Sequence, residues 1–300
     1  MKILVTGASS LPGYRFVREA LGRGHEVIGL HYSNPIPIEN EKLTKIRLDI
    51  RDLGSLSNVI VNERPDVIVH MAALGKVDQC EQDHDLAWSV TARPSIAIAS
   101  IAKKVGAFPI YLSTDYVFDG TSGGYREGDP PAPINYYGLV KLVGEIAFQS
   151  IGEEYAIVRA SSIYGLGPGR MNFAKFLIMK LQNNEEVRAL IDQYTTPTQA
   201  TLLAKALMEI IDRRLTGIFH VVGERLSRYD FAIRVSDKLG LDRTLIRLAK
   251  MEEMRWIAKR PKDSSLNCEK TKKILKTEFH STEYALETLK REYEEEERSR

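Results

Sequence analysis

Tyr137 and Lys141 are residues whose types and spacing could carry out acid–base chemistry. They lie four positions apart in residues 136–150, where apolar side chains recur at helical spacing, so both share one helix face. The pKa of a tyrosine is ordinarily about 10, and an ammonium group one turn away favours the phenolate and lowers it. We therefore predict that Lys141 lowers the pKa of Tyr137 and makes its phenol a usable general acid or base.

Ser113, Thr114 and Asp115 follow an apolar, β-rich run at residues 108–112 that we predict to be a buried strand. In an open parallel sheet, whatever follows the carboxyl end of a strand faces the ligand crevice. We expect this polar trio to lie where a substrate would sit.

A glycine-containing turn joins the first predicted strand, residues 2–6, to a helix at residues 14–21. In that context the amides at the helix start face a pyrophosphate, and the helix dipole favours its charge. Ser10 occupies the place of the middle glycine, where its Cβ would crowd a phosphate and its hydroxyl could donate to one. We predict a dinucleotide site here, with an ordinary tight turn as the alternative; its residues would be Gly7, Ser9, Ser10, Leu11 and Gly13.

The next strands supply the predicted adenosine end of that site. The strand at residues 26–30 ends in His31-Tyr32-Ser33-Asn34, which lacks the acidic residue that would repel a 2′-phosphate. Ser33, Asn34 and a nearby Arg15 would accept that phosphate, so NADP is mildly preferred and NAD is the alternative. A loop that simply faces water explains the same residues almost as well.

Two further pairs complete the predicted cofactor site. Asp49 and Ile50, at the end of a strand at residues 44–50, should flank the adenine. Ala72 and Ala73, after a strand at residues 66–70, are small enough for a flat cofactor to pass close to the backbone, although ordinary tight packing would also use alanine.

Strands and helices alternate from residue 1 to about residue 160, with further helices at residues 52–64 and 86–105 and a sixth strand at residues 155–159. Pro94 should kink or break the second of these helices. This alternation predicts an α/β fold with a doubly wound parallel sheet of the Rossmann type. We assign residues 1–165 to this domain.

The regular alternation of strands and helices does not continue after Gly165. We expect helices at residues 172–182, 202–213, 229–238 and 251–256 and strands at residues 187–192 and 217–222. We assign residues 166–280 to a smaller substrate-binding lobe, intimately joined, from which a strand or helix could return to the main sheet. Residues 281–300 should form a charged terminal helix, by default solvated and alternatively a tail that binds a partner.

The composition is that of an ordinary globular chain. Its 300 residues are 43% hydrophobic with a net charge of +2, which gives no reason to expect nucleic acid as a partner. No apolar run reaches the roughly 18 residues of a membrane span, and the first strand leaves no room for a signal peptide, so we expect a cytoplasmic location and no membrane partner. Cys80 and Cys268, with no CxxC spacing, fit a reducing compartment and predict no metal site.

The motifs are spread from residue 6 to residue 266. They are Thr6-Gly7 to Gly13, Met71-Ala72-Ala73 with Val77-Asp78 and Glu81, Ser113 to Phe118, Tyr137 to Lys141, Asn172 to Lys175, Asp192-Gln193 with Pro197-Thr198, and Arg260-Pro261 with Ser264 and Leu266. In these motifs the chain resembles the extended short-chain dehydrogenase/reductases, and among them the dTDP-4-dehydrorhamnose reductase family.

The resemblance implies a reaction and three catalytic residues. Hydride from NADPH or NADH would reduce the 4-keto group of a nucleotide-linked deoxysugar, converting dTDP-4-dehydro-L-rhamnose to dTDP-L-rhamnose. Tyr137 would donate the proton, Lys141 would hold the nicotinamide ribose, and Thr114 would hydrogen-bond the C4 carbonyl. Arg159 and Ser161 would lie near the nicotinamide or the substrate. The implied substrate-binding residues are Val77, Asp78, Thr114, Asp115, Tyr116, Ser162, Asn172, Phe173, Gln193 and Arg260.

Three positions depart from the family pattern: Ser10, Thr91 where asparagine is usual, and Pro94. The same block also resembles the β subunit of methionine adenosyltransferase, an NADP-binding regulatory member of this superfamily, so a methionine adenosyltransferase partner is the alternative to catalysis. Another nucleotide-sugar reductase or an epimerase is a third interpretation, because the catalytic trio is shared among them. The sequence leaves a homodimer open.

Overall fold

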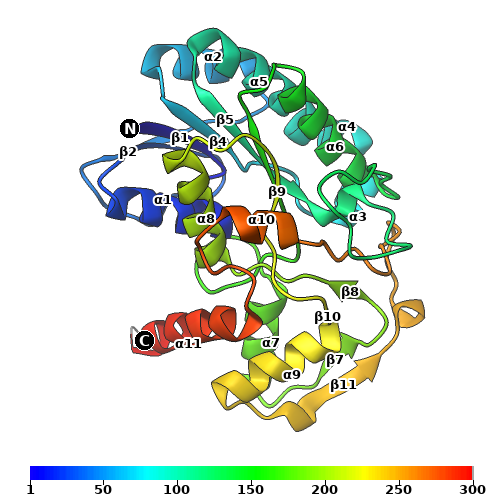
Figure 1. Ribbon diagram of the computed structural model, residues 1–300. Helices are drawn as coiled ribbons and strands as arrows, with labels where there is room; N and C mark the ends of the chain where they lie inside the picture. The colour runs from blue at the N-terminus through cyan, green and yellow to red at the C-terminus, as the bar shows by residue number, and fades with distance from the viewer. Residues whose placement is uncertain (299–300) are drawn as a thin grey trace.

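The computed structural model describes residues 1–298 and is built on a seven-stranded parallel sheet (Figure 1). The strand order is β3-β2-β1-β4-β5-β6-β9. The strands are β1 (Lys2–Thr6), β2 (Glu26–His31), β3 (Leu43–Arg47), β4 (Val67–His70), β5 (Phe108–Thr114), β6 (Ala156–Ala160) and β9 (Gly217–His220). The order reverses direction at β1, between β2 and β4, which confirms the predicted doubly wound α/β fold.

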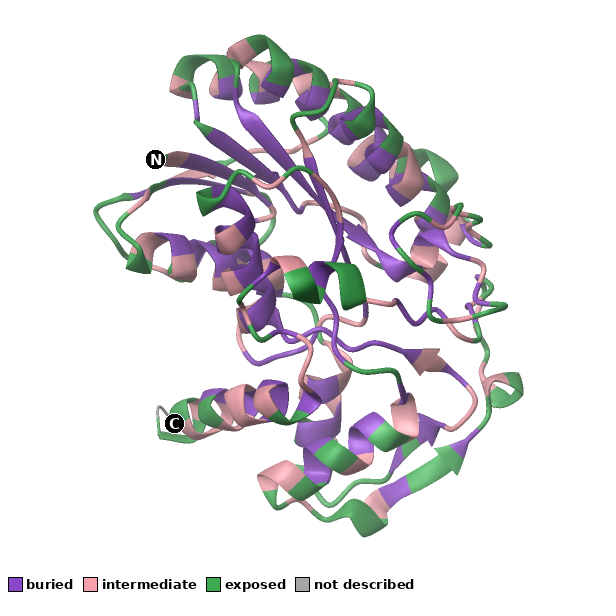
Figure 2. Cartoon of the chain, viewed as in Figure 1, coloured by how far each residue is buried: buried purple, intermediate pink, exposed green. Residues whose placement is uncertain are grey.

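Helices cover both faces of the sheet because alternate strand residues point to opposite sides. In β1, Ile3 and Val5 pack towards α1 (Leu11–Gly22) and α8 (Ala200–Asp212), whereas Leu4 packs on the other face. That second face is covered by α2 (Leu53–Glu63), α5 (Arg93–Val105) and α6 (Tyr136–Gln149). The central strands are accordingly buried along nearly their whole length (Figure 2).

A smaller lobe lies below the carboxyl edge of the sheet in the view of Figure 1. Its elements are α7 (Phe173–Gln182), β7 (Val187–Leu190), β8 (Tyr194–Thr195), β10 (Leu226–Ser227), α9 (Arg228–Leu239), β11 (Ile246–Ala249), α10 (Glu269–Ile274) and α11 (Thr282–Arg298). One apolar cluster runs from Ile3 in the sheet to Phe231 and Leu289 in the lobe. The two parts therefore share a core.

The segment we assigned to the lobe does return to the main sheet. β9 pairs with β6 as the seventh strand, and α8 lies against α1 on the face of the sheet. Of the remaining lobe strands, β7 and β11 pair in parallel, and β8 and β10 pair antiparallel. The chain thus passes from sheet to lobe and back before it ends in α11.

Several element boundaries differ from the sequence predictions. The predicted strand at residues 44–50 ends at Arg47, so Asp49 and Ile50 lie in the loop after β3. The first helix begins at Leu11 because Ser10 caps it. The predicted short helix at residues 251–256 is a single 3-10 turn at Met251–Glu253.

The predicted break near Pro94 is a π-helical turn at Trp88–Ala92, between α4 (His84–Ala87) and α5. Pro94 itself stands in the first turn of α5, where its missing N–H is not needed. Thr91, in the π turn, accepts a hydrogen bond from the Leu74 amide at 3.0 Å. Within residues 1–298, none of the helices combines the length and apolarity needed to cross a bilayer.

Candidate active site

A cleft of about 1150 Å³ opens where the carboxyl ends of the strands face the lobe. Its floor comes from the start of α1 and from the segments that follow β4, β5 and β6, as the topology predicts for a doubly wound sheet. Sites for one small ligand usually measure about 300–1,000 Å³. The volume therefore suits a dinucleotide and a second ligand together.

The glycine turn after β1 has the close contacts that exclude larger residues. Gly7 has φ +69°, and a Cβ there would lie 3.0 Å from the Ala72 backbone. A Cβ on Gly13 would lie 2.2 Å from the Gly7 carbonyl oxygen. Both glycines thus allow close backbone packing within the turn. Ser10 and Leu11 of the same turn line the cleft.

Ser10 uses its hydroxyl within the turn. Its hydroxyl donates to the Gly7 carbonyl at 2.7 Å and accepts from the Gly13 amide at 3.2 Å, so it caps α1. The idea that this hydroxyl is directed to a phosphate is therefore wrong in this structure. Serine is among the preferred helix N-cap residues, which explains why it substitutes for glycine here.

The segment that follows β4 is held in place by the last residue of β1. The Thr6 hydroxyl accepts from the amides of Met71 and Ala72, both at 3.1 Å, and bonds His70 Nδ1 at 2.7 Å. Burial lowers the pKa of His70 to about 3, so the ring is neutral. This network places Ala73 in the wall of the cleft, with Ala72 behind it against Gly7. The sequence had not indicated this role for Thr6 or for His70.

The predicted adenosine residues lie beyond the described lining of this cleft. His31 ends β2, Ser33 is exposed in the following loop, and Asp49 pairs with Arg51 at 2.5 Å next to Ile50. Hydrogen bonds from Arg51 lower the pKa of Asp49. Arg51 is thus a cation at this end of the sheet that the sequence analysis missed.

Arg15 does not take the place we predicted beside the 2′-phosphate. Its guanidinium forms an ion pair with Glu292 at 3.2 Å and donates to the Leu166 carbonyl at 2.6 Å. These buried partners direct the side chain to α11 and not to the loop after β2.

The helix that carries Tyr137 is held tightly against the end of β5. Asn135 caps α6 by accepting from the Gly138 amide at 2.9 Å, and Glu81 accepts from the Tyr136 amide at 2.9 Å. A Cβ on Gly138 would lie 2.1 Å from the Tyr116 carbonyl oxygen, so no larger residue fits. Tyr137, Lys141 and Thr114 consequently line the same stretch of the cleft.

The predicted effect of Lys141 on Tyr137 is wrong in this structure. Burial raises the pKa of Tyr137 to about 12, opposed in part by a hydrogen bond with Thr114. The Lys141 ammonium instead donates to the Leu112 carbonyl at 2.7 Å and lies 4.0 Å from the centre of the Tyr111 ring. Burial lowers the pKa of Lys141 to about 7. The phenol therefore keeps its proton at neutral pH, which suits a proton donor better than a base.

Asp115 orients Thr114 from beneath. It is buried, it accepts from the Thr114 hydroxyl at 3.0 Å, and it accepts from Ser161 at 2.7 Å and Ser264 at 2.5 Å. Burial raises the pKa of Asp115, and these hydroxyls oppose the rise. Because Thr114 donates to Asp115, its oxygen is left as an acceptor for the neighbouring phenol.

Arg159 is not at the ligand side of β6, where we expected it. It is 1% exposed and faces α6, where Nε and Nη2 bond the two Glu145 carboxylate oxygens at 2.9 and 2.7 Å. Ser113 also donates to Glu145, at 2.5 Å. Ala160 and Ser162, on the other side of the chain, line the cleft.

Several predicted substrate residues line the cleft but use their polar atoms within the protein. Asp78 accepts from the Ala258 amide at 3.0 Å and pairs with Arg260 at 3.0 Å. Asn172 caps α7 and donates to the Gly165 carbonyl at 2.8 Å. Gln193 accepts from the Arg228 Nε at 2.7 Å. These contacts fix the shape of the cleft wall, and they occupy polar atoms of Asp78, Asn172 and Gln193 that a substrate would otherwise meet.

Phe173 does not line the cleft, in contrast to our expectation. It packs 6.2 Å from Phe231, centre to centre, and beneath the Arg228 guanidinium at 5.4 Å. Its side chain therefore supports Arg228, which does line the cleft. Val77 and Tyr116 lie in the lining as predicted.

The lobe side of the cleft is rich in cations that no motif revealed. Arg170, Arg188 and Arg228 join Arg260 in the lining, near Trp256, whose ring lies 5.3 Å from the Arg260 guanidinium. Asp78 and Asp115 are the acidic side chains among the described lining residues. The excess of positive charge favours an anionic ligand.

A family model described as the RmlD substrate binding domain matches residues 1–295. The chain belongs to this family. It is 32% identical over 272 residues to a probable low-salt glycan biosynthesis reductase of Haloferax volcanii, covering 89% of this chain and 90% of that one. It is also 31% identical over 281 residues to methionine adenosyltransferase 2 subunit beta of Xenopus laevis, covering 91% and 82%.

Solved structures agree with this assignment. A hypothetical dTDP-4-dehydrorhamnose reductase of Sulfolobus tokodaii has 37% identity and a TM-score of 0.83, covering 93% of this chain and 97% of that one. The dTDP-4-dehydrorhamnose reductase of Bacillus anthracis, solved in complex with NADP, has 29% identity and a TM-score of 0.85, covering 96% and 98%. The family resemblance inferred from the sequence is confirmed.

Proposed function

We propose that this protein reduces the 4-keto group of a nucleotide-linked deoxysugar with NADPH, converting dTDP-4-dehydro-L-rhamnose to dTDP-L-rhamnose. The observation that carries the proposal is the position of the Tyr137 phenol beside Thr114, in a cleft that also contains the glycine turn and an arginine-rich wall. The protein is an NAD(P)-dependent oxidoreductase of its family, as the reductases among its structural neighbours are.

The residues present fit a dinucleotide. The start of α1 places the Leu11 backbone amide beside the cleft, and Ala73 leaves space at the exit of β4. The residues that would hold the dinucleotide are Gly7, Ser9, Ser10, Leu11, Gly13, Ala72, Ala73, Tyr137 and Lys141, with His31, Ser33, Asp49 and Ile50 at the adenosine end. When bound, NADPH supplies the hydride that reduces the carbonyl carbon.

The protein's own residues supply the proton and position the ketone. Tyr137 transfers its phenolic proton to the carbonyl oxygen as that oxygen gains negative charge, so an alcohol forms. Thr114, whose hydroxyl donates to Asp115, lies beside the phenol and keeps it aimed at the cleft. Lys141, whose ammonium donates to the Leu112 carbonyl, would hold the nicotinamide ribose.

Specificity for a nucleotide diphosphate would come from the lobe. Arg228 and Arg260 are held by Gln193 and Asp78 and present guanidinium groups to the cleft. A guanidinium group can donate two parallel hydrogen bonds to the oxygens of one phosphate. Val77, Tyr116, Ser162 and Asn172 would complete the sugar pocket.

The test is oxidation of NADPH by the purified protein with dTDP-4-dehydro-L-rhamnose, followed by nicotinamide absorbance and product chromatography. We expect turnover by the wild type and a fall in kcat of about 10²- to 10⁴-fold in Tyr137→Phe. The variant should still bind NADPH, because the other residues of the dinucleotide site are kept. A wild-type protein that binds NADPH but reduces none of the 4-keto nucleotide sugars offered, whether linked to dTDP, UDP or GDP, would contradict the proposal.

A second candidate is a regulatory subunit, favoured by the similarity to methionine adenosyltransferase 2 subunit beta. It predicts a stable complex with a methionine adenosyltransferase catalytic subunit in gel filtration, unaffected by Tyr137→Phe. Separate elution of the two proteins would exclude it.

A further inference from the structure

The loop after β6, residues 165–170, runs directly over the first residues of α1. A Cβ on Gly169 would lie 2.8 Å from the Leu11 amide nitrogen and 3.2 Å from the Ser10 Cα. A Cβ on Gly167 would lie 3.5 Å from the Leu11 and Tyr14 side chains. We call residues 165–170 the β6 loop. It forms an outer wall beside the turn that faces the pyrophosphate under the proposed function.

The β6 loop is tied at both ends. Arg170 donates to the Gly75 carbonyl in the segment after β4, so the loop crosses from one strand exit to another. At its base, Asn172 donates to the Gly165 carbonyl at 2.8 Å, and Lys175 donates to the Gly167 carbonyl at 3.1 Å. The position of the loop is thus set by contacts and not by its glycine-rich sequence.

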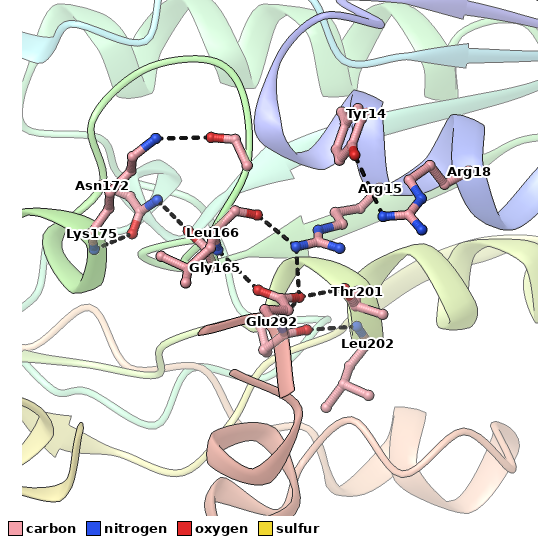
Figure 3. Close-up of polar contacts among 12 residues, drawn as sticks. Tyr14, Arg15, Arg18, Gly165, Leu166, Asn172, Lys175, Thr201, Leu202 and Glu292 are labelled. Atoms are coloured by element: carbon pink, nitrogen blue, oxygen red, sulfur yellow. Dashed lines mark hydrogen bonds and ion pairs between the residues drawn. The ribbon is translucent and has the colours of Figure 1, made fainter. Parts of the chain in front are cut away.

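The middle of the β6 loop is hydrogen-bonded to the C-terminal helix, α11. Glu292 on α11 is 6% exposed, and its Oε2 accepts from the Leu166 amide at 2.9 Å (Figure 3). Its Oε1 accepts from Gln199 at 2.8 Å and Thr201 at 2.7 Å, at the start of α8. One carboxylate therefore joins α11, α8 and the β6 loop.

Arg15 of α1 contacts both Glu292 and the β6 loop. Its Nη2 lies 3.2 Å from Glu292 Oε1 and donates to the Leu166 carbonyl at 2.6 Å (Figure 3). Both backbone polar groups of Leu166 are consequently bound by this ion pair, the amide by Glu292 and the carbonyl by Arg15. The pair is almost fully buried, with 11% and 5% of the two side chains exposed.

We propose that Glu292 is a positioning residue for the dinucleotide site: with Arg15 it fixes Leu166, and so holds the β6 loop against the N-terminus of α1, where the pyrophosphate binds. The inference rests on the proposed function for its dinucleotide. It gives the C-terminal helix a role in cofactor binding although none of the residues of α11, Thr282–Arg298, lines the cleft. Replacing the carboxylate with an amide leaves one acceptor oxygen for the four donors that Glu292 now receives, from Leu166, Gln199, Thr201 and Arg15, so the loop is held less firmly. A loosely held loop lowers affinity because ordering it on binding costs free energy.

The test compares Glu292→Gln with the wild type by calorimetric titration with NADPH and by steady-state kinetics. Glu287→Gln is the matched control, because Glu287 lies on the same helix but pairs with Lys238 at the surface. We expect the Kd and KM for NADPH to rise about tenfold in Glu292→Gln, with kcat and the KM for the sugar nucleotide unchanged. Hydrogen exchange should rise in residues 165–170. The control should match the wild type.

A second variant separates positioning from fold stability. In Arg15→Met/Glu292→Met no buried charge is left unpaired, so thermal stability should return while NADPH affinity stays low, because Leu166 lacks its partners. If affinity returns with stability, or if Glu292→Gln binds NADPH as the wild type does, the inference is overturned. Failure of the wild type to bind NADPH would instead overturn the proposed function.

If Glu292→Gln does not fold, Gly169→Ala decides the matter. Gly169 is exposed with φ +94°, and its new Cβ would meet the Leu11 amide nitrogen, so the loop must shift away from α1. We expect the same selective rise in the KM for NADPH. Unchanged NADPH kinetics in a folded Gly169→Ala protein would refute a role for the loop.

Discussion

Replacing Lys141 with methionine should stabilise the protein while abolishing its activity. Burial depresses the pKa of Lys141 from 10.5 to about 7, with Glu145 opposing the shift. At about 1.4 kcal/mol per pH unit, this corresponds to roughly 5 kcal/mol of stability lost in carrying a buried ammonium at low pH. Methionine has a similar length and no charge, but leaves the Leu112 carbonyl without its donor, which costs about 1–3 kcal/mol. The net gain should be about 2 kcal/mol or more below pH 7.

The pH dependence distinguishes this explanation from simple repacking. Between the folded pKa of about 7 and the unfolded value of 10.5, the unfolded wild type binds a proton that the folded protein has released. Wild-type stability therefore rises with pH in that window, and the advantage of Lys141→Met should shrink by about 1.4 kcal/mol per pH unit above pH 7. Below pH 7 the advantage should be constant.

The assay is urea unfolding of both proteins without dinucleotide, from about pH 6 to about pH 9.5. Lys104→Met, at an exposed position of α5, is the control and should show no pH-dependent difference. A Lys141→Met protein less stable than the wild type at pH 6, or a difference that stays flat across the whole range, would refute the reasoning. In the first case the ammonium would be well accommodated; in the second it would not titrate near pH 7.

Three further substitutions test the walls of the cleft. Gly13→Ala places a Cβ 2.2 Å from the Gly7 carbonyl oxygen and should cost about 1–3 kcal/mol of stability and weaken NADPH binding, measured by thermal melting and calorimetry; unchanged melting would show that the turn can widen. Ser10→Gly should cost only a few tenths of a kcal/mol and leave NADPH affinity within about threefold, so a large gain in affinity would mean that the serine does obstruct the phosphate. Asp78→Asn removes the charge that pairs with Arg260 and should raise the KM for the sugar nucleotide about tenfold at unchanged kcat; an equal rise in the KM for NADPH would argue against a substrate-side role.

Much of the fold could be predicted because its signals are local. The strands that form β1, β4 and β5 are short apolar runs, and the Tyr137–Lys141 spacing follows from helical geometry alone. The direction of the Lys141 ammonium could not be predicted, because its partner, the Leu112 carbonyl, comes from another element.

Arg159 differs from Lys141, since its placement had a local signal that we did not use. In β6, Val158 and Ala160 face α1 and α8, and residues alternate along a strand, so Arg159 must face α6. The arginines of the lobe had no such signal. Arg170 and Arg228 stand in a loop and at a helix start without a motif, and only the folded chain brings them to one wall.

The return of the chain to the sheet at β9 has a consequence for engineering. A graft of the lobe from a relative with another sugar preference would need crossover points on both sides of α8 and β9, near residues 161, 199 and 221, because these two elements belong to the scaffold. A shortened chain that stops after β6 would expose the outer edge of that strand and lose the helix that covers α1. The scaffold and the lobe are therefore interleaved along the chain, so an exchange of the lobe must keep α8 and β9 in place.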